Sequence, residues 1–386
     1  MPSSSCLVPR VAEWPFDVDV VTAVHTPTRP VERAVRSVLD HTNARFRVTV
    51  VAHNTDPAGI AARLGNLLED PRVRLLTHED EYRTPAGPKN VGLAEATAEY
   101  VAMLDSDDTL EPGALDAWLD AARGIKGGAD AVIAPTTTAA GAIHPSPPVR
   151  WHRIKPEAPK QLDALRDRLA YRASPLGLIG RARFSHLRFA EGIPTGEDQP
   201  VTAELWFTQG SRVVFPAYAP RYLEHHDQED RVTGVTRSVA DEFLSLDRTL
   251  AEGAPWGSDA RVRTAVATKL IRVHLFDALR SRIASGWTPD NARELASVAE
   301  RIVAWGPGCV GLLAKTDAKL LNLVREASVE TDVLRSQLSK RQQLRSLDAV
   351  LASKLRFTLH PQAPLRYHLA SLLIARRVRR RSAATA

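Results

Sequence analysis

The sequence predicts an α/β fold with a Rossmann-like, mostly parallel central sheet flanked by helices, followed by an α-helical C-terminal region. Short valine-rich runs alternate with amphipathic helical patterns between residues 17 and 104, as consecutive βαβ units do. Strand signals disappear after about residue 235, and apolar residues then recur every three or four positions. The change in periodicity therefore indicates two regions of different architecture.

The first region contains four strand-like runs, each as apolar as a sheet buried on both faces requires. They cover residues 19–24, 47–52, 73–76 and 100–104. Pro30 suits the first turn of a helix after the first run, and Asp56 with Pro57 opens another after the second. Residues 136–148 show no periodicity, so we expect a long loop beside the sheet edge.

The second region predicts helices. Apolar residues spaced by three or four from Val262 to Ile283 predict one helix, residues 316–347 a long polar one, and residues 365–381 a last one. We therefore divide the chain into an N-terminal extension (1–16), an α/β domain (17–235), a helical domain (236–360) and a basic amphipathic tail helix (361–386).

Length and composition indicate a soluble globular protein. The chain has 386 residues, 44% of them hydrophobic, which is enough for two ordinary cores. It has no apolar run long enough to span a bilayer, and its first residues lack the pattern of a signal peptide. The two cysteines, Cys6 and Cys309, can form neither a disulfide framework nor a cysteine-based zinc site. We expect a cytoplasmic protein.

The positive charge lies mainly at one end of the chain. Five of the net +6 charges come from Arg376, Arg377, Arg379, Arg380 and Arg381. The nearly neutral body has no basic stripe with interleaved aromatic residues, which argues against a nucleic-acid partner. An apolar helical face followed by arginines is typical of a peripheral anchor on an anionic membrane, here the inner face. A solvated end is the alternative.

The strongest chemical feature is an acidic loop, Asp105-Ser106-Asp107-Asp108, directly after the strand at 100–104. The carboxyl end of a parallel strand is where such folds hold ligands. Mg²⁺ and Mn²⁺ bind through a few carboxylates together with substrate phosphates, so a diphosphate ligand is implied. Alternatively, Asp108 caps a helix that begins near Pro112.

The acidic loop follows a second motif in the order and spacing of a known family. Pro88-Lys89-Asn90 opens a helix ahead of the strand that ends in the acidic loop. Together they resemble the central signature of the family-2 glycosyltransferases, inverting enzymes with a glycosyltransferase A-type fold. The resemblance implies that residues 17–235 are the catalytic domain.

The same resemblance implies roles for single residues. Asp105 and Ser106 would contact the nucleotide, with Asp105 on the ribose, and Asp107 would bind a divalent metal that bridges the diphosphate. Lys89 and Asn90 would lie near the nucleotide, although Lys89 could equally be a solvated surface lysine.

Two further segments resemble the family's nucleotide site. Thr26, Pro27 and Thr28 follow the first strand, where the family's backbone frames the base. His53 ends the second strand, where the family most often has an aspartate pair that helps to read uracil. This departure leaves the identity of the base open.

A second acidic element, Glu197-Asp198, resembles the family element whose aspartate is the catalytic base. Such a base takes the proton of an acceptor hydroxyl while that oxygen attacks the anomeric carbon. Alternatively, both carboxylates only cap a helix that begins near Pro200. His226, next to His225, lies where related enzymes often have a residue near the diphosphate, and we expect it to complete the metal site.

These features predict an inverting, metal-dependent hexosyl- or N-acetylhexosaminyltransferase. It would use Mn²⁺ or Mg²⁺ and a nucleotide-diphosphate sugar, with UDP-sugars favoured. The acceptor would be a hydroxyl of a glycan or polyol-containing molecule in glycan or cell-surface polymer synthesis. One alternative is a haloacid-dehalogenase-like phosphatase with Asp105 as nucleophile, although such enzymes carry that loop on their first strand. The other is a non-catalytic scaffold.

Overall fold

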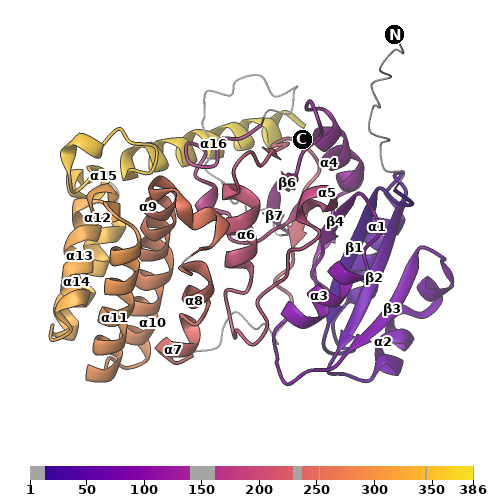
Figure 1. Cartoon of the computed structure of the whole chain (residues 1–386), viewed down its shortest axis with the longest axis horizontal. Helices are drawn as coiled ribbons and strands as arrows, with labels where there is room; N and C mark the ends of the chain where they lie inside the picture. Colours follow the sequence, from indigo (N-terminus) through magenta and orange to yellow (C-terminus); the bar gives the residue numbers. More distant parts are fainter. Residues whose placement is uncertain (1–13, 140–160, 229–236, 252, 344–345, 386) are drawn as a thin grey trace, which may run out of the picture.

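The computed structural model describes residues 14–139, 161–228, 237–251, 253–343 and 346–385. A sheet-containing part and a helical part lie side by side, and the last helix runs from the helical part toward the sheet (Figure 1). Residues 1–13, most of the N-terminal extension, and residues 140–148 of the expected loop lie outside the described residues.

The central sheet has seven strands in the order β3-β2-β1-β4-β8-β6-β9. The four strands expected from the sequence are confirmed and pair in parallel. The sheet is mixed because β8 runs antiparallel to both β4 and β6. The strands are β1 (Val18–Val24), β2 (Phe46–His53), β3 (Val73–His78), β4 (Tyr100–Met103), β6 (Ala131–Ile133), β8 (Gly177–Gly180) and β9 (Val213–Val214).

Helices cover both faces of this sheet. One core joins the sheet to α1 (Val31–Leu39), α2 (Pro57–Leu64) and α4 (Ala114–Arg123). The other joins it to α3 (Ala86–Ala94), α5 (Arg181–Phe184) and α6 (Asp198–Phe207). Gly92 lets α3 lie close against β1, because a Cβ there would overlap the side chain of Val21. Short 3-10 turns occupy Gly65–Glu69 and Leu169–Tyr171.

A three-stranded sheet stands beside the carboxyl end of β4. Its central strand β10 (Tyr222–Glu224) pairs antiparallel with β5 (Thr109–Leu110) and parallel with β7 (Thr136–Thr138). The expectation of a loop from residue 136 was therefore wrong at its start. Its three threonines are β-branched and find a partner in β10, which is distant in sequence.

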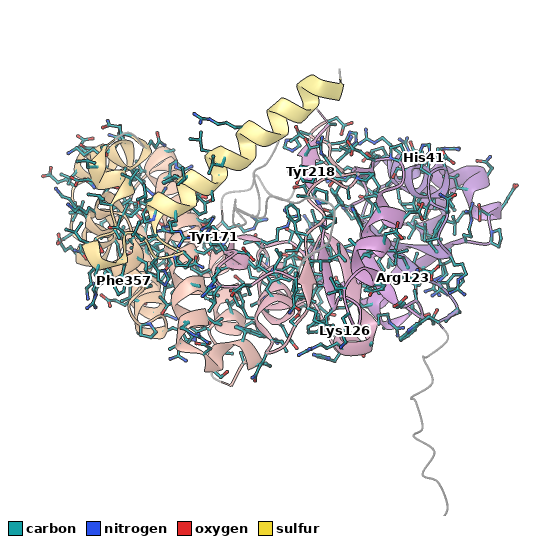
Figure 2. All side chains as sticks on the ribbon, turned by 90° about the horizontal axis from the view of Figure 1, so that it is seen from above. His41, Arg123, Lys126, Tyr171, Tyr218 and Phe357 are labelled. Carbon is teal, nitrogen blue, oxygen red and sulfur yellow. The ribbon has the colours of Figure 1, made fainter. Side chains whose placement is uncertain are left out.

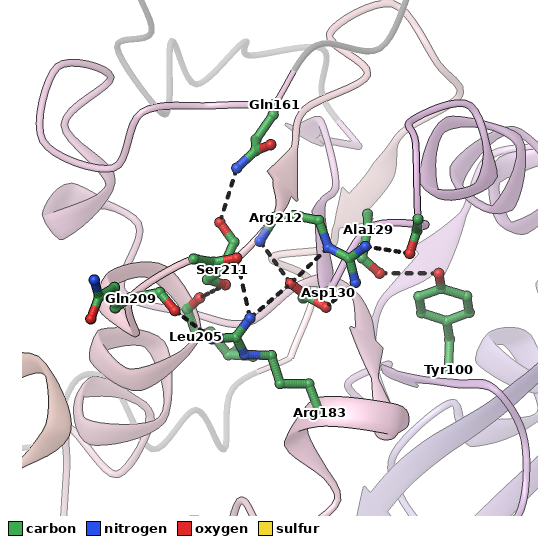
Figure 3. Close-up of polar contacts among 11 residues, drawn as sticks. Tyr100, Ala129, Asp130, Gln161, Arg183, Leu205, Gln209, Ser211 and Arg212 are labelled. Atoms are coloured by element: carbon green, nitrogen blue, oxygen red, sulfur yellow. Dashed lines mark hydrogen bonds and ion pairs between the residues drawn. The ribbon is translucent and has the colours of Figure 1, made fainter. Parts of the chain in front are cut away.

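A charged network lies where β6 and β9 begin, at one edge of the large sheet (Figure 3). The Asp130 carboxylate accepts hydrogen bonds from the backbone nitrogen of Arg212 at 2.8 Å and from its Nη2 at 2.7 Å. Arg183 lies 3.5 Å from the same carboxylate. Because Asp130 is buried, its carboxylate needs these donors to offset lost hydration. We assign this network a structural role.

The helical part has α-helices throughout, as the apolar spacing predicts. Beyond β10 the described residues form only one isolated bridge, between Ala314 and Ala352. The helices and turns are α7 (Val239–Glu242), α8 (Ser245–Thr249), η4 (Pro255–Ser258), α9 (Ala260–Lys269), the π-helical turn η5 (Leu270–Leu275), α10 (Phe276–Ser285), α11 (Pro289–Trp305), α12 (Cys309–Leu312), α13 (Lys315–Glu326), α14 (Thr331–Gln342), α15 (Leu347–Val350), η6 (Leu355–Phe357) and α16 (Pro364–Thr385).

One helical expectation was wrong. The segment 316–347 forms two packed helices, α13 and α14, instead of one long helix. The chain turns at Ala327, whose φ of 54° is left-handed and ends α13. Leu334 and Leu338 of α14 are then buried in the same core as Leu320 and Leu321 of α13. Burial of these leucines against each other favours the hairpin.

The two parts share packing at their junction. Ala203 of α6 belongs to the core of the helical part. Buried Arg272 donates hydrogen bonds to the Tyr171 hydroxyl at 2.9 Å and to the carbonyl oxygen of Gln362 at 2.7 Å. The Tyr171 ring lies 4.9 Å from the ring of Tyr367 in α16, and Figure 2 shows Tyr171 beside the start of that helix. A domain boundary at residue 235 stays a prediction.

Candidate active site

The candidate site lies at the carboxyl edge of the parallel strands. β1, β2 and β4 are in parallel register and end near Val24, His53 and Met103. The segments that follow them include Thr26–Thr28, His53 and the acidic loop, so parallel pairing brings these sequence-predicted residues to one edge. This is the edge at which open α/β sheets bind ligands.

The acidic loop is held by β10. The Tyr222 hydroxyl accepts a hydrogen bond from the Asp105 backbone nitrogen at 3.0 Å and donates one to Asp108 Oδ2 at 2.9 Å. The backbone nitrogen of His225 donates to Asp108 Oδ1 at 2.8 Å. Both oxygens of Asp108 therefore accept hydrogen bonds from β10 and the residue after it. Asp105 stays exposed.

The environment of Asp108 explains its electrostatics. Burial, reinforced by the nearby charge of Asp105, raises the pKa of Asp108 to about 7. The alternative in which Asp108 caps the next helix is not supported, since α4 begins after Gly113 without a side-chain cap. Asp108 instead joins the loop to the small sheet.

Asp107 faces two arginines from the segment after β1. Its Oδ2 lies 2.5 Å from Arg29 Nη1, and both side chains are largely buried. Arg33 donates to the Asp107 carbonyl oxygen and also pairs with Asp227 at 2.6 Å. Two guanidinium groups therefore lie beside Asp107, and such groups bind phosphate oxygens in paired hydrogen bonds.

Lys89 links the two acidic elements. Its Nζ lies 3.6 Å from Asp198 Oδ1 and 3.8 Å from Glu197 Oε1, and it stands over the Phe189 ring at 5.0 Å. Burial alone lowers the pKa of Lys89, but the charges of Asp198, Asp105 and Glu197 outweigh burial and raise it. The side chain is only 10% exposed, so Lys89 is no solvated surface lysine.

Asp198 is the first residue of α6 and lacks the contacts that would satisfy its carboxylate. Ser174 donates a hydrogen bond to the carboxyl group, but buried Oδ1 has no hydrogen-bond partner among the described residues. Burial raises the pKa of Asp198 to about 7, with Lys89 acting against the rise. Neighbouring Glu197 adds to the rise, and its side chain makes no capping hydrogen bond to α6.

Asn90 positions the segment that leads to the second acidic element. Its Oδ1 accepts from the Phe189 backbone nitrogen at 2.7 Å, and its Nδ2 donates to the Phe189 carbonyl oxygen at 3.0 Å. Nδ2 also donates to Glu191 at 2.7 Å. The amide of Asn90 therefore binds protein groups and orients residues 189–191 beside α3.

The helical part supports α6 from behind. Lys269, at the end of α9, places its Nζ 2.6 Å from His274 Nε2 and 3.4 Å from Oε1 of Gln199, which follows Asp198. Burial lowers the pKa of Lys269 to about 7. Gly196 allows a close approach to α8, because a Cβ there would lie 2.8 Å from Ser245 Oγ. Residues 196–199 are thus fixed by contacts with the helical part.

The residues predicted to frame the base lie at the other side of this edge. The hydroxyl oxygens of Thr26 and Thr28 lie 3.0 Å apart and share a hydrogen bond, and Pro27 is exposed between them. His53 is buried and its Nε2 lies 2.9 Å from Asp80 Oδ1. Ser106 is buried within the acidic loop.

The two histidines after β10 differ in their contacts. His225 Nε2 lies 2.9 Å from Thr109 Oγ1, whereas His226 is half exposed and 4.0 Å from Glu224 Oε2. Within the described ranges, Asp107 and His226 belong to no cluster of three metal-ligating atoms. The predicted role of His226 therefore stays a prediction.

Sequence reasoning missed Arg29, Arg33 and Asp80. Arg29 and Arg33 lie on either side of Pro30, in the segment that follows the first strand at the ligand-binding edge, and this position could have been noticed. Asp80 follows the third strand by two residues, at the same ligand-binding edge. Lys269 carried no such signal, since its partner Gln199 is distant in sequence.

Comparisons with known proteins agree with this geometry. Residues 19–182 match the model of glycosyl transferase family 2. The chain is 36% identical over 102 residues to the succinoglycan biosynthesis protein ExoO of Rhizobium meliloti, a match that covers 26% of this chain. It spans only 28% of the length of that relative.

Solved structures share the fold. The structure of S. aureus TarS residues 1–349 in complex with UDP-GlcNAc superimposes with a TM-score of 0.63 at 17% identity, covering 85% of this chain and 92% of that chain. A longer S. aureus TarS structure matches with a TM-score of 0.61 at 17% identity, covering 85% of this chain and 55% of that one. The likeness extends into the helical part, since 85% coverage exceeds the sheet-containing part.

The acidic loop follows β4 in the middle of the sheet, which disfavours the phosphatase alternative, in which the loop follows the first strand. The signature motifs, the sheet and the family match agree. Residues 19–182 are thus similar to glycosyl transferase family 2, and the chain has a glycosyltransferase A-type fold followed by a helical C-terminal region.

Proposed function

We propose that the chain transfers a sugar from a nucleotide-diphosphate donor to a hydroxyl acceptor with inversion at the anomeric carbon. The observation that carries the proposal is the meeting of two acidic elements on one buried ammonium. Glu197 and Asp198 lie within 4 Å of Lys89 Nζ, and Asp105 of the acidic loop also acts on its charge. A donor site and a base are thereby adjacent.

Asp198 is the proposed general base. Its Oδ1 accepts no hydrogen bond from the described residues and lies 3.6 Å from the Lys89 ammonium, so it can accept the proton of an acceptor hydroxyl while that oxygen attacks the anomeric carbon and the nucleotide diphosphate leaves. A pKa of about 7 suits this role, since a base is most effective when its pKa lies near the working pH. Lys89 favours the charged form of Asp198, because it is the nearby cation.

Asp107 is the proposed carboxylate ligand of a divalent ion, Mn²⁺ or Mg²⁺. Such ions bind through one or two carboxylates and complete their shell with phosphates and water, so Asp107 together with the donor diphosphate is a suitable donor set. When bound, the ion supplies charge neutralisation for the departing diphosphate. Arg29 holds Asp107 in place and, with Arg33, adds positive charge beside the phosphates. His226 remains a further proposed ligand.

We place the nucleotide between the two sides of this edge. Thr26, Pro27, Thr28 and His53 would contact the base, and Asp105 and Ser106 the ribose. Among donors we favour UDP-sugars, because the TarS structure of similar fold contains UDP-GlcNAc. We favour a glycan or another polyol-containing molecule as acceptor because the relative ExoO is a succinoglycan biosynthesis protein.

The test is release of nucleotide diphosphate from UDP-, GDP- and TDP-sugars with Mn²⁺ or Mg²⁺, with the product anomer assigned by NMR. We expect one donor to be turned over, and Asp107→Asn to abolish its metal-dependent turnover. Asp120→Asn is the matched control, because Asp120 is an exposed carboxylate on α4. No turnover or binding of any donor would contradict the proposal.

We also propose that α16 attaches the enzyme to the cytoplasmic face of an anionic membrane. Leu369 and Leu372 are 47% and 49% exposed, and arginines follow from residue 376. The end of α16 extends away from the body (Figure 2). No helix among the described residues is long and apolar enough to cross a membrane. Surface binding by leucines and arginines is the remaining mode that this helix supports.

Vesicle co-sedimentation tests this attachment. We expect the full chain to pellet with phosphatidylglycerol-containing vesicles but not with neutral phosphatidylcholine vesicles, and high salt to release it. Leu369→Ser with Leu372→Ser should weaken pelleting without changing donor turnover. Equal pelleting with both kinds of vesicle would contradict the charge-based attachment.

A further inference from the structure

A second cluster of ligand-type side chains lies at the carboxyl ends of β2 and β3. His53 ends β2, His78 ends β3, and Asp80 follows in the next loop. His53 Nε2 lies 2.9 Å from Asp80 Oδ1, and His78 Nε2 lies 3.1 Å from Asp80 Oδ2. One ligand atom from each residue lies within 4.8 Å of the others. Parallel pairing of β2 with β3 places His53 directly opposite His78.

The carboxylate of Asp80 is oriented before any ligand arrives. Its Oδ1 accepts hydrogen bonds from Asn54 Nδ2 at 3.2 Å and from the Tyr82 backbone nitrogen at 2.9 Å. The orientation of the carboxylate is therefore fixed by groups around it, as in protein metal sites.

The surroundings of the cluster leave little room for side chains. The first turn of α3 lies against it, and a Cβ on Gly87 would overlap His78 and Asp80. Glycine at this position therefore keeps the space around the two ligand groups open. The His78 side chain is 24% exposed and the His53 side chain 4%, so the cluster is reached from the side of His78.

We propose that His53, His78 and Asp80 bind a transition-metal ion such as Zn²⁺. Two imidazole nitrogens and one carboxylate oxygen are a donor set that zinc uses in proteins, with a fourth position left for water. Imidazole donors select such ions over Mg²⁺, which binds through carboxylates and substrate phosphates.

Proton balance accompanies binding. Without the ion, a charged Asp80 can hold both imidazoles only if each Nε2 carries a proton to donate. The ion takes the Nε2 lone pairs, so each histidine keeps its single proton on Nδ1 instead. Asp80 turns Oδ2 to the ion and retains the hydrogen bonds from Asn54 and Tyr82 on Oδ1. No oxidant, reductant or donor sugar is required.

Titration of the metal-stripped full chain with Co²⁺, followed by visible absorption, is the test, with Zn²⁺ displacement measured by calorimetry. We expect one Co²⁺ per chain with the intense bands of a four-coordinate site, and their loss when Zn²⁺ is added. His78→Gln and Asp80→Asn should each weaken binding by at least about tenfold, since even groups outside the ligand shell contribute this much.

Two variants separate this site from others. Asp107→Asn should leave the Co²⁺ spectrum unchanged, because Asp107 lies in the acidic loop after β4 and is none of the three proposed ligands. His186→Gln is the matched histidine control, since His186 is exposed and pairs with Glu204. Thermal unfolding of each variant verifies its fold. Absence of four-coordinate bands, an unchanged spectrum in both His78→Gln and Asp80→Asn, or loss of the bands in Asp107→Asn would overturn the proposal. All measurements omit nucleotide, so they are independent of sugar transfer.

Discussion

The two acidic elements of the site differ in how their carboxylates are satisfied. In the acidic loop, Asp108 accepts hydrogen bonds on both oxygens, from the Tyr222 hydroxyl and the His225 backbone. In the second element, Asp198 leaves buried Oδ1 without a hydrogen-bond partner in the described part of the chain. Burial nevertheless raises the pKa of both to about 7.

This contrast shows that a shifted pKa does not by itself identify a base. A carboxylate whose two oxygens both accept hydrogen bonds from the protein has a structural role, because its acceptor capacity is used within the fold. One with an unused oxygen beside a cation has capacity left for a substrate proton. Hydrogen-bond accounting therefore separates Asp108 from Asp198, and the following experiments test that separation.

The largest effect is expected from Asp198→Asn. An amide cannot accept the acceptor proton, so kcat for transfer should fall by about 10²- to 10⁴-fold, the usual contribution of a general base. Glu197→Gln is the matched control. Its kcat for transfer should fall far less, because Glu197 acts on Asp198 only through its charge. Equal losses in the two variants would contradict the choice of Asp198. Steady-state kinetics with donor and acceptor measures both.

The next effect is a shift in the pH dependence of kcat. The Lys89 ammonium lowers the pKa of Asp198, so Lys89→Met should raise that pKa and leave the base protonated at neutral pH. The acid limb of the kcat profile should move to higher pH by about one to three units, the range expected for an opposite charge nearby. Lys89→Arg keeps the charge and should restore the limb. An unmoved limb would show that Lys89 does not tune the base.

A third effect concerns the acidic loop. Tyr222→Phe removes the hydroxyl that joins the Asp105 backbone to Asp108, leaving both groups without that partner. The free energy of unfolding should fall by about 1–3 kcal/mol, the cost of unsatisfied buried polar groups. Tyr82→Phe, at an exposed ring, should change it little. Chemical denaturation of both variants provides the comparison, and equal stability would remove the assigned role of β10.

The smallest effect is expected behind α6. Lys269→Met breaks the hydrogen bond to Gln199 and should lower kcat by about tenfold or less with KM for donor unchanged, since coupling through intermediate residues is on the order of 0.5–2 kcal/mol. A rise in donor KM without a change in kcat would place Lys269 in donor binding instead. Lys269→Arg, which keeps a long donor side chain, should recover part of the loss.

Much of the α/β architecture follows from local pattern. The strands β1 to β4 and the helices α1 and α2 appear in the sequence as apolar runs and amphipathic repeats, and the structure confirms them. Residues 136–138 and 316–347 were misassigned because their secondary structure depends on residues distant in the chain. Strand β7 forms by pairing with β10, and the α13–α14 hairpin forms because leucines of the two helices are buried together. Propensity alone does not include such partners.

By itself, the sequence determined the periodicity of the elements and the acidic motifs at the strand ends, because both depend only on residues that are close together in the chain. Only the tertiary structure decided that Lys89 pairs with Asp198, that Tyr222 holds Asp108, and that Lys269 supports α6. Each of these contacts joins residues distant in the chain, and the burial that shifts their pKa values arises only when the parts pack together.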